Sequence, residues 1–215
     1  MTSNKLIYNH SLYPFYTAFL PKNRAKQVIE SMKGNKGEDI YNRTGIMASS
    51  ISENRYLKYC LVCANEDKKE YGELFWHRVH QIPCLQICPK HKTLLLDSEV
   101  LVHSGNKHEF IGATNENCCI TGGNINNSIS YQQKVLDRMI VLANNVEKLL
   151  KNKYSNRPLN WFQEQYVTKL KEMGLVNING KVKYKELLNS FIEYHGKEFL
   201  ELGYNKEITS QFSEK

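Results

Sequence analysis

Apolar residues in the second half of the chain recur every three or four positions. Over residues 131–150 this spacing predicts one long amphipathic helix. The same spacing predicts a helix over residues 160–174, with Asn160 as its capping residue, and a further helix over residues 184–194. A short last helix is expected over residues 197–202. This half of the chain is therefore predicted to be helical.

A hairpin is predicted between two of these helices. The Asn179-Gly180 pair lies between the alternating apolar residues Val176 and Val182, and both turn positions are expected to take positive φ. Helix, hairpin, helix is an order compatible with a winged-helix or helix-turn-helix domain.

The first half of the chain is less regular. Residues 22–33 read as a helix that begins after Pro21, and residues 64–71 as a short helix ended by a glycine. Residues 94–102 are rich in Leu and Val and are expected to be strand-like. The dense aromatic cluster over residues 8–19 is expected to be covered by a neighbouring segment.

Two pairs of metal-binding residue types lie between these elements. Cys60 and Cys63 form a Cys-x-x-Cys turn, and Cys88 and His91 form a Cys-Pro-x-His turn. Each turn can point both of its donors to one side, so the two turns complete a tetrahedral Zn²⁺ site that leaves no position for water. The sequence therefore predicts one structural zinc ion held by these four residues. The alternative is that the cysteines are ordinary buried packing residues.

Other histidines and cysteines raise the question of a second metal: His77, His80, Cys84, His103, His108, Cys118 and Cys119. A residue between the two ligand pairs could replace one of the four ligands or begin a second site. Successive side chains diverge, however, so Cys118 and Cys119 are poor partners for one ion, and we interpret them as two ordinary thiols.

Net charge and cysteine content indicate which cellular compartment and which type of partner to expect. The formal net charge is +7 and the isoelectric point is about 9.0, which suits an anionic partner. Residues 1–5 do not lead into a signal peptide, and no apolar run approaches the length of a membrane span. We therefore expect a cytoplasmic protein without membrane contact, whose six cysteines stay reduced.

The helical half carries the candidate surface for double-stranded DNA. Lys181, Lys183 and Lys185 alternate along the hairpin and the next helix, so they can line one face. Together with Trp161 and Lys169 they are predicted to contact phosphates, which dominate affinity for nucleic acids. The alternative is a solvated lysine face on an ordinary helical bundle.

An enzyme needs a different constellation. The sequence contains no phosphate-binding Gly-x-x-x-x-Gly-Lys-Ser/Thr loop, no Gly-x-Ser-x-Gly elbow and no His-Glu-x-x-His motif. His77 and His80 superficially resemble part of a metal nuclease, but no acidic residue or asparagine follows at a spacing that completes a Mg²⁺ site. We expect no catalytic activity.

Residues 59–67, 71–83 and 88–95 together resemble the TniQ family of transposon target-selection proteins, in particular its Tn7-type, TnsD-like members. In this resemblance Cys60, Cys63, Cys88 and His91 take the zinc positions. Trp76, His80, Gln81 and Pro83 take spacer positions that we interpret as scaffold. Cys84 stands where the family usually has glycine.

The resemblance implies a role, and a nucleoid-associated place in a bacterial cell. Such a protein binds a specific chromosomal attachment DNA and recruits an AAA+ regulator ATPase, TnsC-like, which in turn brings the transposase. The long C-terminal domains of TnsD proteins are not in this sequence, so we expect a partial chain. Two rival hypotheses are a zinc-stabilised protein-interaction module that docks the ATPase without touching DNA, and a metal-dependent nuclease.

The predicted fold class is mainly α with small β hairpins. We expect a TniQ-like zinc-knuckle or zinc-ribbon domain over residues 1–128. A helical, winged-helix or helix-turn-helix-like DNA-binding domain is expected over residues 129–215.

Overall fold

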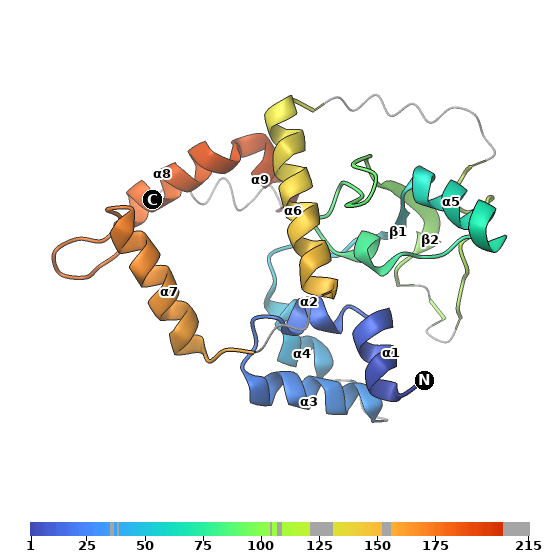
Figure 1. The fold of residues 1–215 in the computed structure, drawn as a ribbon, viewed down its shortest axis with the longest axis horizontal. Coiled ribbons are helices and arrows are strands. Elements are labelled where there is room, and N and C mark those ends of the chain that lie inside the picture. Colours follow the sequence, from blue (N-terminus) through green and yellow to red (C-terminus); the bar gives the residue numbers. More distant parts are fainter. Residues whose placement is uncertain are drawn as a thin grey trace. The chain divides into compact units, whose positions relative to one another are not determined.

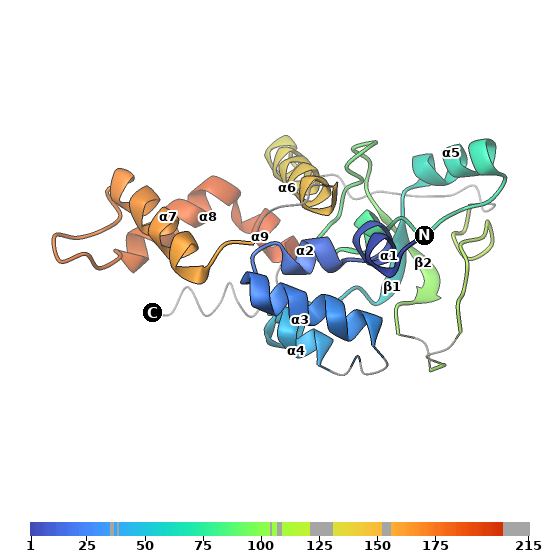
Figure 2. The ribbon, with the colours of Figure 1, turned by 60° about the horizontal axis from the view of Figure 1, so that its bottom comes forward.

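The computed structural model describes residues 1–34, 37, 39–103, 105–106, 109–120, 131–151 and 156–203. The chain divides into two compact units. One consists of Met1–Ser50 together with Leu149–Lys215, and the other of Ile51–Lys148. The fold is mainly helical with a small antiparallel sheet, as predicted (Figures 1 and 2). The predicted division at residues 128/129 lies outside the described residues and stays a prediction.

The middle unit is built on strands β1 (Tyr56–Tyr59) and β2 (Leu96–Leu101), which lie side by side in Figure 1. They pair antiparallel, with Lys58 opposite Asp97 and Tyr59 opposite Leu96. Every second side chain of β2 points inward, so Ser98 and Val100 are buried. β1 leads directly into helix α5 (Leu61–Tyr71), and the short 3₁₀ helix η2 (Arg78–Gln81) follows it along the chain.

Side-chain hydrogen bonds and a small buried core hold this unit together. Gln81 hydrogen-bonds to both backbone groups of Lys58, donating to its carbonyl at 2.8 Å and accepting from its N–H at 3.0 Å. The indole N–H of Trp76 donates to the carbonyl of Ile111 at 2.7 Å. A cluster of buried residues supports the sheet and α5: Tyr59, Ala64, Leu74 and Cys118. The interpretation of the spacer positions as scaffold agrees with these contacts.

Helix α6 (Gln133–Lys151) presents the apolar face that the sequence predicts. Its buried residues recur at helical spacing: Val135, Met139, Ala143, Val146 and Leu150. Within the described part of the chain, no helix is long and apolar enough to cross a membrane.

The other unit begins with short helices: α1 (Ser3–His10), α2 (Tyr13–Thr17), α3 (Lys22–Lys33), α4 (Ile40–Thr44) and the 3₁₀ helix η1 (Ile46–Ala48). Helix α3 has the predicted bounds. The aromatic cluster is partly covered, because Tyr13 is buried with Ile7, Val28 and Ile29. The Tyr13 hydroxyl donates to the carbonyl of Ala25 at 3.1 Å.

The same unit continues with helices α7 (Leu159–Glu172), α8 (Tyr184–His195) and α9 (Lys197–Gly203), close to their predicted positions. The Asn156 amide ties the start of this segment to the carbonyls of Thr17 and Leu20, at 2.8 and 2.9 Å. Neither α7 nor α8 has a buried residue. The winged-helix or helix-turn-helix comparison for this segment therefore stays a prediction.

Two local predictions in this segment are wrong. Asn160 does not cap α7, since the helix begins at Leu159 after Pro158 and has no side-chain cap. The turn between the helices has a positive φ at Gly180, 75°, but not at Asn179. The chain instead closes a three-residue loop, in which the Asn177 N–H donates to the Lys181 carbonyl at 2.9 Å. The hairpin itself is present as a bridge between Val176 and Val182.

Candidate metal centre

The end of β1 and the start of α5 position the first ligand pair. Cys60 is the extended residue that precedes α5, and Cys63 lies in the first turn of that helix. The carbonyl of Cys60 accepts from the N–H of Ala64 at 2.9 Å, which closes the first helical turn. Both thiols thus lie at a helix N-terminus, where the helix dipole favours thiolates.

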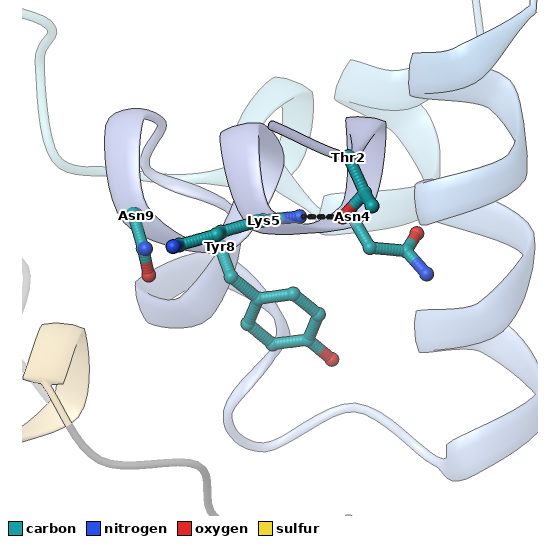
Figure 3. A pocket seen from close by; sticks show the side chains of 5 residues that line it. All are labelled: Thr2, Asn4, Lys5, Tyr8 and Asn9. Atoms are coloured by element: carbon teal, nitrogen blue, oxygen red, sulfur yellow. Dashed lines mark hydrogen bonds between the residues drawn. The ribbon is translucent and has the colours of Figure 1, made fainter.

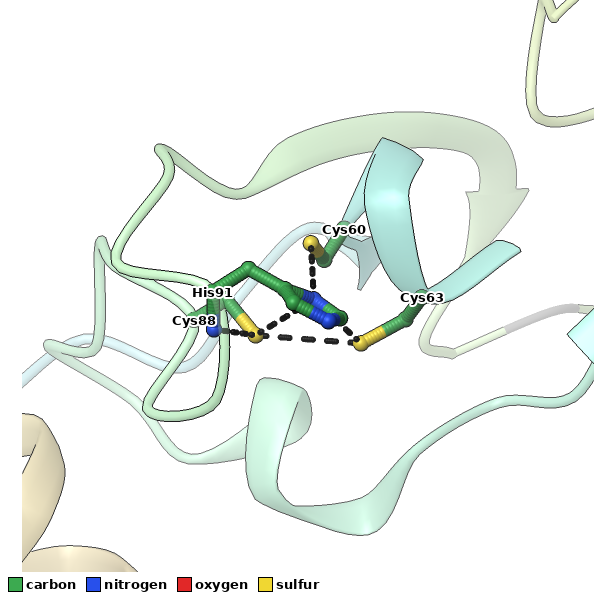
Figure 4. A group of neighbouring side chains, drawn as sticks. All are labelled: Cys60, Cys63, Cys88 and His91. Carbon is green, nitrogen blue, oxygen red and sulfur yellow. Dashed lines mark hydrogen bonds between the residues drawn. The ribbon is translucent and has the colours of Figure 1, made fainter. Parts of the chain in front are cut away.

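A tight turn positions the second pair. The N–H of Cys88 donates to the carbonyl of Thr93 at 2.8 Å, and the N–H of Lys92 donates to the carbonyl of Cys88 at 2.9 Å. Lys92 reverses the chain with a φ of 58°. This turn brings the Cys88 thiol and the His91 ring to the same side, facing the first pair (Figure 4).

The four donor atoms of Cys60, Cys63, Cys88 and His91 all lie within 4.8 Å of one another. His91 Nδ1 is 3.5 Å from Cys60 Sγ, 3.3 Å from Cys63 Sγ and 3.8 Å from Cys88 Sγ. The sulfurs of Cys63 and Cys88 are 3.7 Å apart. Zinc–sulfur bonds of about 2.3 Å and zinc–nitrogen bonds of about 2.1 Å put tetrahedral ligand atoms about 3.6–3.8 Å apart. The cluster therefore has the dimensions of a tetrahedral site.

Electrostatics also favour a cation at this position. All three cysteines are buried. Hydrogen bonds from the Cys63 and Cys88 thiols lower the pKa of Cys60, and hydrogen bonding to the Cys60 sulfur raises the pKa of both Cys63 and Cys88. Three thiolates this close repel one another unless a cation compensates their charge. Three sulfurs and one imidazole are a donor set that suits zinc.

The second ring nitrogen of His91 has its own neighbour. Its Nε2 is 3.0 Å from Glu66 Oε2, within ion-pair range but out of line for a hydrogen bond. Lys90 Nζ donates to the same carboxylate oxygen at 2.6 Å. Glu66 lies on α5. The first turn of this helix positions Cys60 and Cys63, and the helix also places a carboxylate beside His91.

The other candidate ligands lie outside the cluster of four. His77 Nε2 is 2.7 Å from Asp67 Oδ2, and His103 Nε2 is 2.8 Å from Glu53 Oε2. His80 is buried with its Nε2 4.0 Å from Cys63 Sγ, and burial lowers its pKa to about 4.

The remaining cysteines also stand apart from the cluster. Burial raises the pKa of the Cys84 and Cys118 thiols to about 11 in each case. Cys119 is exposed and donates to Glu99 Oε1 at 3.5 Å. His108 lies outside the described residues. Among the residues that the structure describes, the cluster of four is the group in which at least three such donors converge.

The predicted DNA-contacting residues are all exposed on α7, the hairpin and the start of α8: Trp161, Lys169, Lys181, Lys183 and Lys185. The guanidinium of Arg157 lies 5.4 Å from the centre of the Trp161 ring. Lys169 forms an ion pair with Glu172 at 2.9 Å, and Lys183 Nζ donates to the carbonyl of Gly174 at 3.0 Å. Their role in DNA contact stays a prediction.

A shallow hollow beside α1 is lined by Thr2, Asn4, Lys5, Tyr8 and Asn9 (Figure 3). The N–H of Lys5 donates to Thr2 Oγ1 at 3.3 Å, which caps the helix. The lining is uncharged apart from one lysine and brings together no set of metal donors, so this hollow adds no candidate chemistry.

The part of the chain that contains the ligand cluster matches a known protein family. The TniQ family model matches residues 1–95, which contain the whole ligand cluster, and a family model described as Tn7-like transposition protein D matches residues 142–210. Transposon Tn7 transposition protein TnsD of Escherichia coli is 31% identical over 106 residues, which are 49% of this chain. The match spans 20% of the length of that relative. Over residues 1–95 and 142–210 the chain is therefore similar to the TniQ/TnsD family of transposition proteins.

Proposed function

We propose that this chain acts in target selection for a Tn7-like transposon. In this proposal it binds double-stranded DNA at a chromosomal attachment site, and recruits a TnsC-like AAA+ ATPase to that site on the nucleoid. The observation that carries the proposal is the presence of both a TniQ match and a Tn7-like transposition protein D match on one chain. The relative named above is a transposition protein, which supports the same process.

The metal centre has a structural part in this proposal. Zinc bound by Cys60, Cys63, Cys88 and His91 would have four protein ligands and no open coordination position. Such an ion links the turn at the start of α5 to the turn over residues 88–93. Because these turns are separated by the spacer, the ion orders the scaffold residues between them. The closed donor set supports a protein without catalytic activity and disfavours the nuclease hypothesis.

The DNA surface is assigned to the segment from α7 to α8. Lys181, Lys183 and Lys185 are exposed there, and neither helix buries a residue, so their surfaces are open to a macromolecule. Lysine side chains in such a position supply phosphate contacts that fix register without reading sequence. Lys169 is the weaker candidate, because its ammonium group already pairs with Glu172.

A protein-interaction module remains the second candidate function. The observation in its favour is the number of exposed apolar side chains on α7 and α8: Leu159, Tyr166, Tyr184, Phe191 and Tyr194. Exposed aromatic residues of this kind are enriched in protein interfaces. In this alternative the helices dock the ATPase and make no DNA contact.

Duplex binding over a salt series tests the proposal. A labelled duplex with the chromosomal sequence next to the transposon end is compared with a shuffled duplex by fluorescence anisotropy. We expect tighter binding to the chromosomal sequence, and an affinity that falls steeply with salt. Capture of the ATPase without binding to either duplex at low salt would support the docking module instead. Conversion of supercoiled plasmid to nicked or linear forms with Mg²⁺ or Mn²⁺ would favour the nuclease.

A further inference from the structure

Each sulfur of the candidate metal centre lies beside at least one hydrogen-bond donor. Thr93 Oγ1 is 3.2 Å from Cys60 Sγ, and the backbone N–H of His91 donates to Cys88 Sγ at 3.5 Å. The third sulfur, that of Cys63, has His80 Nε2 at 4.0 Å. A thiolate can only accept, so with the metal bound the donor in each pair is the hydroxyl or N–H group. Among the described residues, each of the three thiolates therefore has at least one hydrogen-bond donor beside it.

The burial and hydrogen bonding of the His80 ring indicate which of its nitrogens carries the proton. Its side chain is 1% exposed, and its Nδ1 has no hydrogen-bond partner among the described residues. A neutral imidazole carries one proton, and the nitrogen that faces a thiolate is the one that gains from holding it. The surroundings thus favour the tautomer with the proton on Nε2, directed at Cys63.

Helix α5 holds this histidine in place through a second one. The rings of His77 and His80 lie 5.0 Å apart, centre to centre, and the N–H of His80 donates to the carbonyl of His77 at 3.0 Å. His77 Nε2 is 2.7 Å from Asp67 Oδ2. Asp67 is buried on α5 one helical turn after Cys63, so the same helix carries the thiolate and anchors the ring pair that faces it.

We propose that His80 is the outer hydrogen-bond donor to the Cys63 thiolate, and that His77 and Asp67 are positioning residues for it. Zn²⁺ with three thiolates and one neutral imidazole carries a net negative charge in a buried place. An N–H donor to a thiolate offsets part of this charge, and so helps the site to retain its metal. The inference rests on the zinc role proposed above, but it does not depend on DNA binding.

Zinc affinity of the full chain, measured by competition with a chelator, tests this inference. We expect His80→Ala to weaken zinc binding by about 10- to 100-fold, the usual effect of losing an outer-shell partner. His80→Gln, whose amide can still donate, is expected to lose less. The matched control is His103→Ala, since His103 is 66% exposed in its side chain and pairs with Glu53 in the same unit. Affinity of His80→Ala within twofold of wild type would overturn the proposal.

A second measurement needs no variant and covers the case in which His80→Ala fails to fold. The ¹⁵N spectrum of the histidine rings in the zinc-loaded wild type reports which nitrogen of His80 carries the proton. We expect Nε2, and a proton on Nδ1 would overturn the inference. A wild type that binds zinc tightly but ignores DNA would refute target selection and leave this test intact. A wild type that binds no zinc would refute the metal role itself.

Discussion

The side chain of Gln81 pairs with the backbone of Lys58 as a neighbouring strand would. It accepts from the Lys58 N–H at 3.0 Å and donates to the Lys58 carbonyl at 2.8 Å. Lys58 lies in β1, two residues before the ligand Cys60. The amide also donates to the carbonyl of His77 at 3.2 Å. One side chain of η2 thus fixes the strand that leads into the metal centre.

Gln81→Ala is therefore expected to destabilise the chain. It leaves two backbone groups of a buried strand residue without partners, and we expect a loss of about 2 kcal/mol in the free energy of unfolding. Urea unfolding of the zinc-loaded protein measures this. Gln81→Glu is the matched variant, since it keeps the acceptor and loses the donor. Its free energy of unfolding should lie between those of the wild type and Gln81→Ala. An alanine variant as stable as wild type would show that solvent replaces both bonds.

Cys84 has a backbone conformation that favours glycine. Its φ is 67°, in the left-handed region, where a residue with a Cβ is strained and glycine is not. We expect Cys84→Gly to be more stable than Cys84→Ala by about 1 kcal/mol, because both lack the thiol and only alanine keeps the strained Cβ. Thermal unfolding of the two variants gives the difference, and equal stabilities would mean that the strain is negligible.

Alkaline pH should weaken the unit that contains Tyr13. Burial raises the pKa of Tyr13 to about 12, from an ordinary value of 10.0. The folded state therefore favours the neutral phenol, so this contribution to stability is complete below pH 10 and is lost as the pH rises towards 12. Tyr13→Phe cannot ionise and should lose less stability over that range than wild type. Parallel pH profiles for the two proteins, followed by circular dichroism, would contradict the assignment.

The exposed lysines of the hairpin should set part of the salt dependence of DNA binding. If Lys181, Lys183 and Lys185 each contact one phosphate, their joint replacement by Ala lowers the slope of log affinity against log salt by about 3. Zinc content should not change. The matched control replaces three exposed lysines elsewhere in the same unit: Lys5, Lys22 and Lys26. An unchanged slope in the hairpin variant would remove these lysines from the interface.

Local signals in the sequence predicted much of this fold. The helix before Gly34, the helix ended by Gly72 and the long apolar periodicity of α6 all depend on neighbouring residues, and all three helices are present. Strand β1 was missed, since its four residues carry no period of their own. Its partners, β2 and Gln81, are distant in sequence.

The candidate site, too, was predictable from the sequence only where it depends on local geometry. The spacing of Cys60, Cys63, Cys88 and His91 predicted the cluster that the structure brings together, because each turn is local and its geometry follows from a few residues. The contact of His80 with Cys63 could not be predicted from spacing. It depends on tertiary structure, which brings His80 of η2 beside Cys63 of α5.

Elemental analysis of zinc is the decisive experiment for this chain, since the proposed function requires one structural ion to order the region between the two turns. Freshly purified wild type, never exposed to chelator, is compared with Cys88→Ser and with the matched control Cys119→Ser, whose cysteine lies outside the cluster. We expect about one zinc per chain in wild type and control, and loss of both zinc and thermal stability in Cys88→Ser. A folded wild type without zinc, or a Cys88→Ser variant with full zinc and unchanged stability, would show that no structural zinc ion holds the two turns together.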